Sequence, residues 1–141
     1  MPTVFTRIIE GELPGRFVWR DDVCVAFLSI NPLKPGHALV VPRAEVDHWI
    51  DLEPSVMAHL TDVSQHIARA QQAAFAPARV GLMIAGLEVP HVHLHVVPID
   101  EVHDLDFANA AAQPDPVGLD AAAAALRAAL RDQGATGVVD E

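Results

Sequence analysis

One segment, from His91 to Val97, constrains the fold more than any other, because it reads His-Val-His-Leu-His-Val-Val. Side chains of a β-strand point alternately to its two sides, so this alternation predicts a strand with unlike faces. The apolar face, which we expect to point into a core, consists of Val92, Leu94 and Val96. The opposite face carries a row of His91, His93 and His95. Imidazoles donate, accept and attack near neutral pH, and we therefore interpret the histidine row as a reactive site.

The rest of the chain supplies four further strand-like segments and two helices. Strands are expected at 17–20, 23–28, 37–41 and 79–85, with the histidine strand at 91–97. Apolar residues at steps of three and four predict a long helix that ends near residue 75. A short turn or helix is expected at 3–9, and an alanine-rich helix at 119–133. A very short connection through Gly86 would make the last two strands antiparallel neighbours. The expected fold class is α+β, a five-stranded antiparallel sheet with helices on one side.

Composition and charge restrict the partners of the chain. Its 141 residues suit one domain with a real core, since 51% are hydrophobic, and its formal net charge is -10. Such acidity argues against nucleic-acid binding, which needs a basic surface. Apolar stretches stay well below the roughly 18 residues of a membrane span, and we expect no signal peptide and no membrane partner. The one cysteine, Cys24, forms no internal disulfide, so a cytoplasmic location is expected.

Five segments, taken in chain order, carry a family resemblance. They are RIIEGELP at 7–14, AFLSINP at 26–32, GHALVVP at 36–42, EVP at 88–90 and the histidine segment at 91–97. Together they resemble the histidine triad (HIT) family in its Hint-like branch, whose motif is His-φ-His-φ-His-φ-φ with φ apolar. The resemblance implies a HIT-like fold with the HIT domain over residues 1–107. Residues 108–141 are then a linker and a C-terminal helix that packs on the domain or on a dimer partner.

The same resemblance implies an activity. Members of the family are nucleotide hydrolases and transferases that act at the α-phosphate, work as homodimers and need no metal or other cofactor for the chemistry. A nucleoside phosphoramidate or a dinucleoside polyphosphate is the implied substrate. His93 would be the nucleophile that forms a covalent nucleotidyl-histidine, flanked by His91 and His95, with His37 in support. A neutral imidazole is a competent nucleophile at phosphorus, so the residues themselves suit this role.

Substrate contacts are also implied. A purine nucleotide or a related small phosphorylated molecule would contact Phe5, Ile8, Phe27, Ser29, Ile30 and Glu88. The apolar members of this set are equally suited to a plain core. Ser29 stands at the family's ribose-binding Asp, Leu87 stands at a Gln before the triad, and the loop that precedes the triad is shorter than usual. Two alternatives therefore stay open: a nucleotide-binding protein with little turnover, and a metal site built from the histidines with His37 or Glu88 as a further ligand.

A structural zinc site is a separate feature of some relatives, which bind the metal through an N-terminal Cys-x-x-Cys. Thr3 and Thr6 stand in those two places in this chain, and Glu45 stands where a zinc-binding His is often found. Zinc in proteins prefers thiolate and imidazole ligands, so we expect no structural zinc at these positions.

Overall fold

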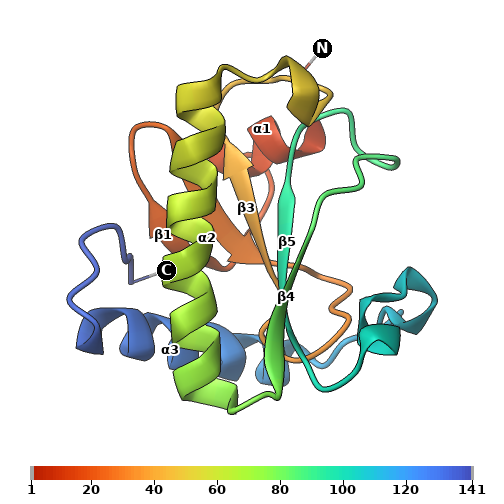
Figure 1. Cartoon of the computed structure of the whole chain (residues 1–141), viewed down its shortest axis with the longest axis vertical. Coiled ribbons are helices and arrows are strands. Elements are labelled where there is room, and N and C mark those ends of the chain that lie inside the picture. The colour runs from red at the N-terminus through yellow and green to blue at the C-terminus, as the bar shows by residue number, and fades with distance from the viewer. Residues whose placement is uncertain (1, 141) are drawn as a thin grey trace.

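A five-stranded antiparallel sheet lies at the centre of the computed structural model, which describes residues 2–140 (Figure 1). The strand order is β1-β2-β3-β5-β4. The strands are β1 (Phe17–Arg20), β2 (Cys24–Leu28), β3 (Ala38–Pro42), β4 (Arg79–Met83) and β5 (Leu94–Ile99). Each neighbouring pair is antiparallel, so the expected α+β class and the five-stranded antiparallel sheet are confirmed.

Helices cover both faces of the sheet. The α-helices are α1 (Val4–Ile9), α2 (Pro54–Phe75) and α3 (Pro116–Asp132), and short 3₁₀ turns occupy η1 (Trp49–Asp51), η2 (Val102–Leu105) and η3 (Phe107–Asn109). The long helix α2 runs along one face of the sheet, and α3 packs against α2 (Figure 1). The short helix α1 contacts the other face through Phe5, which joins Phe17, Phe27 and Leu39 in a second apolar cluster. The expectation that helices lie on one side is therefore wrong for α1.

The main core lies between the sheet and the two long helices. Leu60, Val63 and Ile67 of α2 are fully buried there against Val40 and Leu94 of the central strands. The apolar set of the histidine segment, Val92, Leu94 and Val96, belongs to this core as the alternation predicts. The histidine face is thereby turned toward the second cluster and α1.

The strand that carries the histidines is shorter than expected. It begins at Leu94, so only His95 lies on it, and His91 and His93 precede it. The ladder with β3 ends at the pair of Val40 and Leu94, and Val92 N–H donates instead to the Val46 carbonyl. The backbone of Val92 therefore bonds to the loop after β3 and does not extend the ladder.

The other boundaries differ by a few residues. The strand β4 ends at Met83 rather than Ala85, and residues 84–93 join it to β5, so the connection is not the very short turn expected. The two strands are nevertheless antiparallel neighbours. The helix α3 begins three residues early because the Asp115 carboxylate accepts the Val117 N–H and Pro116 supplies a preset first turn.

The two edges of the sheet are unlike. The C-terminal segment runs beside β1. Arg20 N–H donates to the Gly137 carbonyl at 2.9 Å, and Trp19 forms an isolated antiparallel β-bridge with Val138. The strand β4 forms the other edge and presents Leu82, which is 52% exposed. Within residues 2–140, none of the helices combines the length and the apolar character needed to cross a bilayer.

Candidate active site

Four buried histidines meet where β3 and β5 lie side by side. His37 immediately precedes β3, His95 lies on β5 opposite Leu39, and His91 and His93 lie in the segment that leads into β5. Their exposed fractions range from 0% for His91 to 8% for His95. The structure thus brings together all four of the histidines singled out from the sequence.

The pair of His37 and His95 has a defined proton arrangement. Leu33 N–H donates to His37 Nδ1 at 3.0 Å, so this nitrogen carries no proton. His37 Nε2–H then donates to His95 Nδ1, 2.9 Å away. A neutral imidazole has one donor and one acceptor nitrogen, so the proton of His95 lies on Nε2. His95 therefore offers an N–H donor.

His93 has the opposite arrangement. Its Nδ1–H donates to the His91 carbonyl at 2.7 Å, because a carbonyl oxygen only accepts. The lone pair of the neutral ring is then on Nε2, which has no hydrogen-bond partner among the described residues, and the His93 side chain lines a cavity. The His93 ring lies against His95, with centroids 4.9 Å apart, and against Phe5 at 4.8 Å. His93 is thus fixed with an unprotonated nitrogen available for attack.

Burial keeps the cluster neutral. It lowers the pKa of His95 to about 4 and that of His37 to about 3, with neighbouring imidazoles adding to the effect. Burial also lowers the pKa values of His91 and His93 below their ordinary range, against hydrogen bonds to backbone carbonyls that favour the charged form. At neutral pH the four rings are therefore uncharged, which is the form that a nucleophilic imidazole requires.

These lowered pKa values predict a loss of stability on acidification. An unfolded imidazole titrates near pH 6.5, so between about pH 6.5 and pH 4 the unfolded chain binds protons that the folded chain does not. The free energy of unfolding should then fall by at most about 1.4 kcal/mol per pH unit for each of His37 and His95. Urea unfolding from pH 7 to pH 4 measures this slope. His95→Asn removes one titrating ring, so the free energy of unfolding should depend less steeply on pH. An unchanged slope would contradict a lowered pKa for His95.

A cavity of about 620 Å³ opens beside the histidines. Its walls include the apolar residues expected from the sequence, Phe5, Ile8, Phe27 and Ile30, the polar residues Ser29, Asn31 and Glu88, and His37, His93 and His95. Ile30 is 66% exposed at the rim, whereas Phe5 and Phe27 are buried. Glu88 is the one ionisable side chain other than histidine in this lining. His91 lies behind the wall, and Leu87 is 93% exposed on the loop.

Sequence reasoning missed the part of the lining that comes from residues 107–112. The Phe107 ring lies edge-on to His95 with centroids 5.1 Å apart, and Ala110 to Ala112 continue the wall. Asn31 Nδ2–H donates to the Ala111 carbonyl at 2.9 Å, and Ala111 N–H donates to the Pro32 carbonyl at 3.1 Å. The available signal was Phe107 itself, a lone aromatic residue in an acidic loop.

The helix α2 also supports the site from the far side of the sheet. Gln71 is fully buried, and its Nε2 group donates to the Gly36 carbonyl at 2.9 Å and to the Val96 carbonyl at 2.7 Å. These two residues are the chain neighbours of His37 and His95. One side chain therefore joins the two backbone segments that carry the histidine pair.

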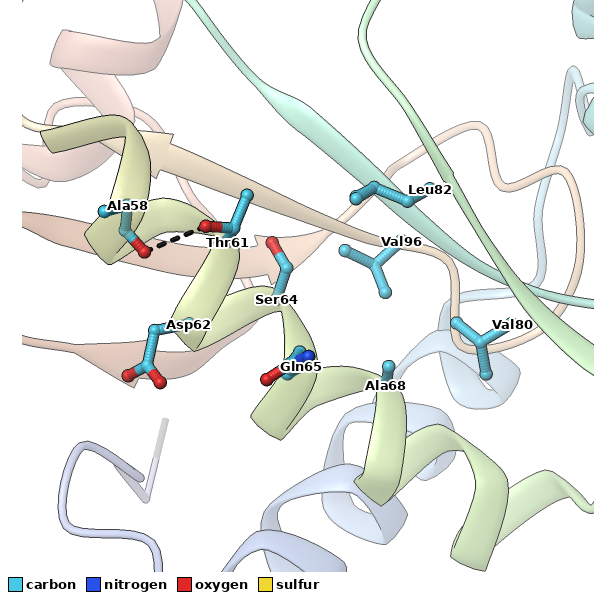
Figure 2. Close-up of a pocket in the computed structure, with 9 residues that line it drawn as sticks. All are labelled: Ala58, Thr61, Asp62, Ser64, Gln65, Ala68, Val80, Leu82 and Val96. Atoms are coloured by element: carbon cyan, nitrogen blue, oxygen red, sulfur yellow. Dashed lines mark hydrogen bonds between the residues drawn. The ribbon is translucent and has the colours of Figure 1, made fainter. Parts of the chain in front are cut away.

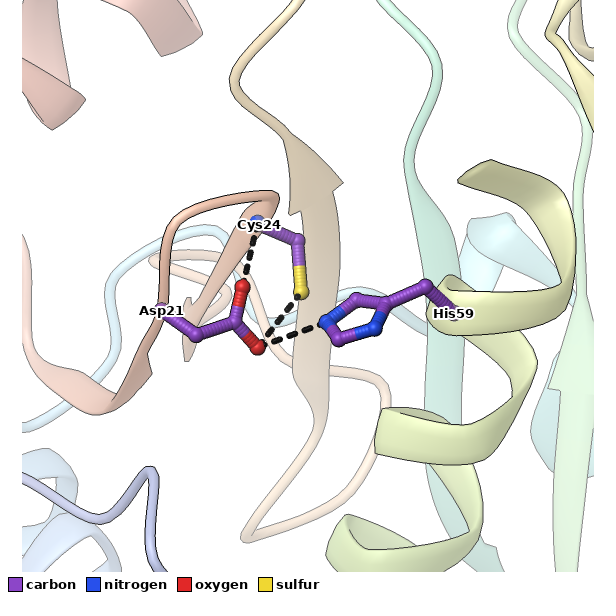
Figure 3. Close-up of side chains that lie close together, drawn as sticks. All are labelled: Asp21, Cys24 and His59. Atoms are coloured by element: carbon purple, nitrogen blue, oxygen red, sulfur yellow. Dashed lines mark hydrogen bonds and ion pairs between the residues drawn. The ribbon is translucent and has the colours of Figure 1, made fainter. Parts of the chain in front are cut away.

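A second cluster contains Asp21, Cys24 and His59, whose possible ligand atoms lie within 4.8 Å of one another (Figure 3). The Asp21 carboxylate accepts from two backbone N–H groups, from Trp19 Nε1 at 2.8 Å and from His59 Nε2 at 2.7 Å. Burial opposes ionisation, yet these hydrogen bonds lower the pKa of Asp21 to about 2. Burial also raises the pKa of the Cys24 thiol, so the thiolate that binds metals is disfavoured. We interpret this cluster as a structural contact that holds the β1–β2 turn against α2.

Comparison with known proteins supplies the family. The HIT domain model matches residues 10–102. The adenylylsulfatase HINT3 of Arabidopsis thaliana is 30% identical over 133 residues, which cover 91% of this chain and 67% of that protein. An uncharacterized HIT-like protein of Mycobacterium tuberculosis is 37% identical over 103 residues, 70% of this chain and 72% of its own.

Solved structures agree. A zinc-bound histidine triad family protein from Mycobacterium smegmatis has a TM-score of 0.80 and 30% sequence identity, and the match covers 93% of this chain and 94% of that one. The family model spans more than half of the chain, and its match includes His37 and the three triad histidines. The chain therefore belongs to the histidine triad (HIT) family, in its Hint-like branch.

Proposed function

We propose that this protein is a nucleotide hydrolase or nucleotidyl transferase that cleaves at the α-phosphate of a nucleoside phosphoramidate or a dinucleoside polyphosphate. The reaction passes through a covalent nucleotidyl-histidine on His93. The observation that carries the proposal is the hydrogen bond from His93 Nδ1–H to the His91 carbonyl, which leaves the Nε2 lone pair of this cavity-lining residue free. Attack by Nε2 forms a P–N bond as the bond to the leaving group breaks, and water then releases the nucleotide.

His95 is the proposed proton donor of the site. Its Nε2 carries the proton because His37 Nε2–H occupies Nδ1, and its ring lies 4.9 Å from that of His93. An α-phosphate beside the cluster brings negative charge, which favours the protonated form of a nearby imidazole. His95 then donates to a phosphoryl oxygen or to the leaving group, and later accepts a proton from the attacking water. His37 is proposed to hold His95 in this tautomer.

The cavity suits the rest of a nucleotide. Phe5, Ile8 and Phe27 supply aromatic and aliphatic surface of the kind that a base contacts. The Ser29 hydroxyl accepts the Asn31 N–H at 3.2 Å, and its own proton is available for a sugar hydroxyl. Glu88 carries a negative charge near His93, which favours leaving groups that are not strongly anionic. We therefore propose a purine nucleoside phosphoramidate as the first substrate to test.

The direct test is to trap the intermediate. The protein is mixed briefly with adenosine phosphoramidate, quenched in base and analysed by mass spectrometry after proteolysis. The expected result is release of AMP and an adenylyl adduct on the peptide that contains His93. Adenylyl sulfate is a useful second substrate, because the Arabidopsis relative is named an adenylylsulfatase. Turnover without an adduct on His93 in either reaction would overturn the covalent mechanism.

Two other functions remain distinguishable. A nucleotide-binding protein with little turnover would bind AMP in calorimetry but release none from either substrate. A metal site needs converging free ligand atoms, whereas the facing nitrogens of His37 and His95 bond to each other and His93 Nδ1 bonds to a carbonyl. Among residues 2–140 the only convergent ligand trio is Asp21, Cys24 and His59, away from the triad. The hydrogen bonds thus favour the nucleotide reaction over a metal site.

We also propose that the protein acts as a homodimer in the cytoplasm. The edge strand β4 and the helix α2 flank a hollow of about 480 Å³, lined by small side chains such as Ala58, Ser64 and Ala68 and by Leu82 (Figure 2). An open strand edge beside an exposed apolar residue is suited to pairing with a second copy. The buried, unpaired Cys24 is compatible with a reducing compartment.

A charge at this edge should separate the two copies. Leu82→Lys places an ammonium group on the proposed interface and should weaken the dimer by about 2 kcal/mol, roughly 30-fold in the dissociation constant. Light scattering over a micromolar concentration series measures the change. Val117→Lys, at an exposed position of α3, is the matched control and should leave the mass unchanged. A wild-type protein that is monomeric at these concentrations would refute the homodimer.

A further inference from the structure

Thr3 makes a hydrogen bond to the first histidine of the triad from the far end of the chain. Its Oγ1 lies 2.6 Å from His91 Nδ1. On the other side of the ring, His91 Nε2 lies 2.7 Å from the Pro42 carbonyl, which only accepts. The proton of the neutral ring is therefore on Nε2, and Nδ1 accepts the Thr3 hydroxyl proton. The two partners select one tautomer of a fully buried imidazole.

The same threonine fixes the start of α1. Thr6 N–H donates to Thr3 Oγ1 at 3.1 Å, so Thr3 caps the helix, and Thr3 N–H donates to Glu45 Oε1 at 2.9 Å. Phe5, two residues after Thr3, packs its ring edge-on against two triad rings. The centroid distances are 5.8 Å to His91 and 4.8 Å to His93. Thr3 thus both caps α1 and bonds to the first triad ring, while Phe5 of the same helix packs against two triad rings.

The chain of contacts continues to the proposed nucleophile. The His91 backbone carbonyl accepts the His93 Nδ1–H. If the His91 ring turns or changes tautomer, this carbonyl loses its fixed direction and His93 loses the bond that keeps Nε2 unprotonated. The contacts therefore run from Glu45 through Thr3 and His91 to His93.

A zinc ion does not suit this cluster. The resemblance places the structural zinc of some relatives at the positions of Thr3, Thr6 and Glu45. Together with His91 they offer two neutral hydroxyls, one carboxylate and one imidazole, whereas structural zinc takes thiolate and imidazole ligands. The Thr3 hydroxyl and the His91 nitrogen are moreover already bonded to each other. Hydrogen bonds thus make the link between α1 and the triad in this chain.

We propose that Thr3 is a positioning residue for the reaction: it donates to His91, selects the His91 tautomer, and thereby holds His93 with its Nε2 free. The kinetic consequence rests on the proposed role of His93, whereas the tautomer can be measured without any activity. A residue that orients a reactive group through a second side chain affects activity by about 10- to 100-fold when it is lost. The effect should appear in kcat rather than KM, because Thr3 is not part of the cavity lining.

The test uses variants at Thr3 and a control at Thr61. Thr3→Val keeps the shape but removes the hydroxyl, Thr3→Asp keeps the helix cap but cannot donate when ionised, and Thr3→Ser keeps both functions. Nitrogen chemical shifts of ¹⁵N-labelled histidines should show His91 with its proton on Nε2 in the wild type and in Thr3→Ser. In Thr3→Asp they should show a proton on Nδ1. Thr61→Val, which removes a hydroxyl that donates to backbone carbonyls of α2, should leave the His91 signals unchanged.

Kinetics complete the test. With adenosine phosphoramidate, kcat should fall at least about tenfold in Thr3→Val and Thr3→Asp, with KM nearly unchanged, and Thr3→Ser should restore it. Urea unfolding separates this effect from loss of the helix cap. A normal kcat in Thr3→Asp, or a lowered kcat with an unaltered His91 tautomer, would overturn the proposal. If the wild type has no turnover, the proposed function fails, while the tautomer measurement still decides the role of Thr3.

Discussion

Replacing His93 with alanine is expected to abolish release of AMP from adenosine phosphoramidate, with a loss of at least about 10³-fold in kcat. The reason is that no other histidine of the cluster both lines the cavity and has a nitrogen with a free lone pair. His37 Nδ1 accepts from Leu33, His95 Nδ1 accepts from His37, and His91 is bonded at both nitrogens. The measurement is the initial rate of AMP formation at saturating substrate.

Two further variants keep this result interpretable. His93→Asn retains an N–H donor for the His91 carbonyl but has no nucleophilic nitrogen, so it should be as inactive as the alanine variant and closer to wild type in stability. His48→Ala removes an exposed histidine outside the cavity lining and should retain full activity. Substantial turnover by a folded His93→Asn protein would exclude His93 as the nucleophile.

Gly36→Ala should be among the most destabilising single substitutions, lowering the free energy of unfolding by about 3 kcal/mol. Gly36 has a φ of +90°, and a Cβ there would overlap the Phe75 ring. The substitution therefore combines backbone strain with a steric clash against the end of α2. It also displaces the carbonyl that accepts the Gln71 amide, next to His37, so activity should fall together with stability.

Gly86→Ala is the matched control for this prediction. Gly86 has a φ of +74°, yet nothing lies within 4 Å of a Cβ built at that position. The control therefore carries the backbone strain alone and should cost about 1 kcal/mol. Urea unfolding of both variants gives the difference. Equal losses for the two would show that the packing of Gly36 against Phe75 contributes nothing.

The sequence predicts the sheet and the core because both depend on periodicity. The alternation at 91–97 places Val92, Leu94 and Val96 in the main core, and the spacing of apolar residues places the end of α2 correctly at Phe75. The start of β5 is not predictable in this way, since alternation continues through His91 and His93 although the ladder with β3 ends at Leu94. Whether an alternating segment forms a ladder depends on a neighbour far away in sequence.

The same limit applies to the site. The four histidines are recognisable from their spacing and from the family motif, whereas the contacts that set their tautomers come from residues without a local signal. Leu33 acts on His37 through its backbone, and Thr3 lies 88 positions from His91. Phe107 reaches His95 only because the loop after β5 folds back over the cavity. Such contacts follow from tertiary structure and not from a pattern of residue types.

The C-terminal segment beside β1 has a consequence for how copies of the chain assemble. An exposed strand edge is a template for adding further strands, and a sheet with two free edges can grow without limit. Here Gly137 and Val138 already occupy the edge at β1, so β4 is the edge left for pairing. Two copies that join through β4 about a two-fold axis use up that capacity in both. Self-association along the sheet then ends at a closed pair and does not propagate into a fibre.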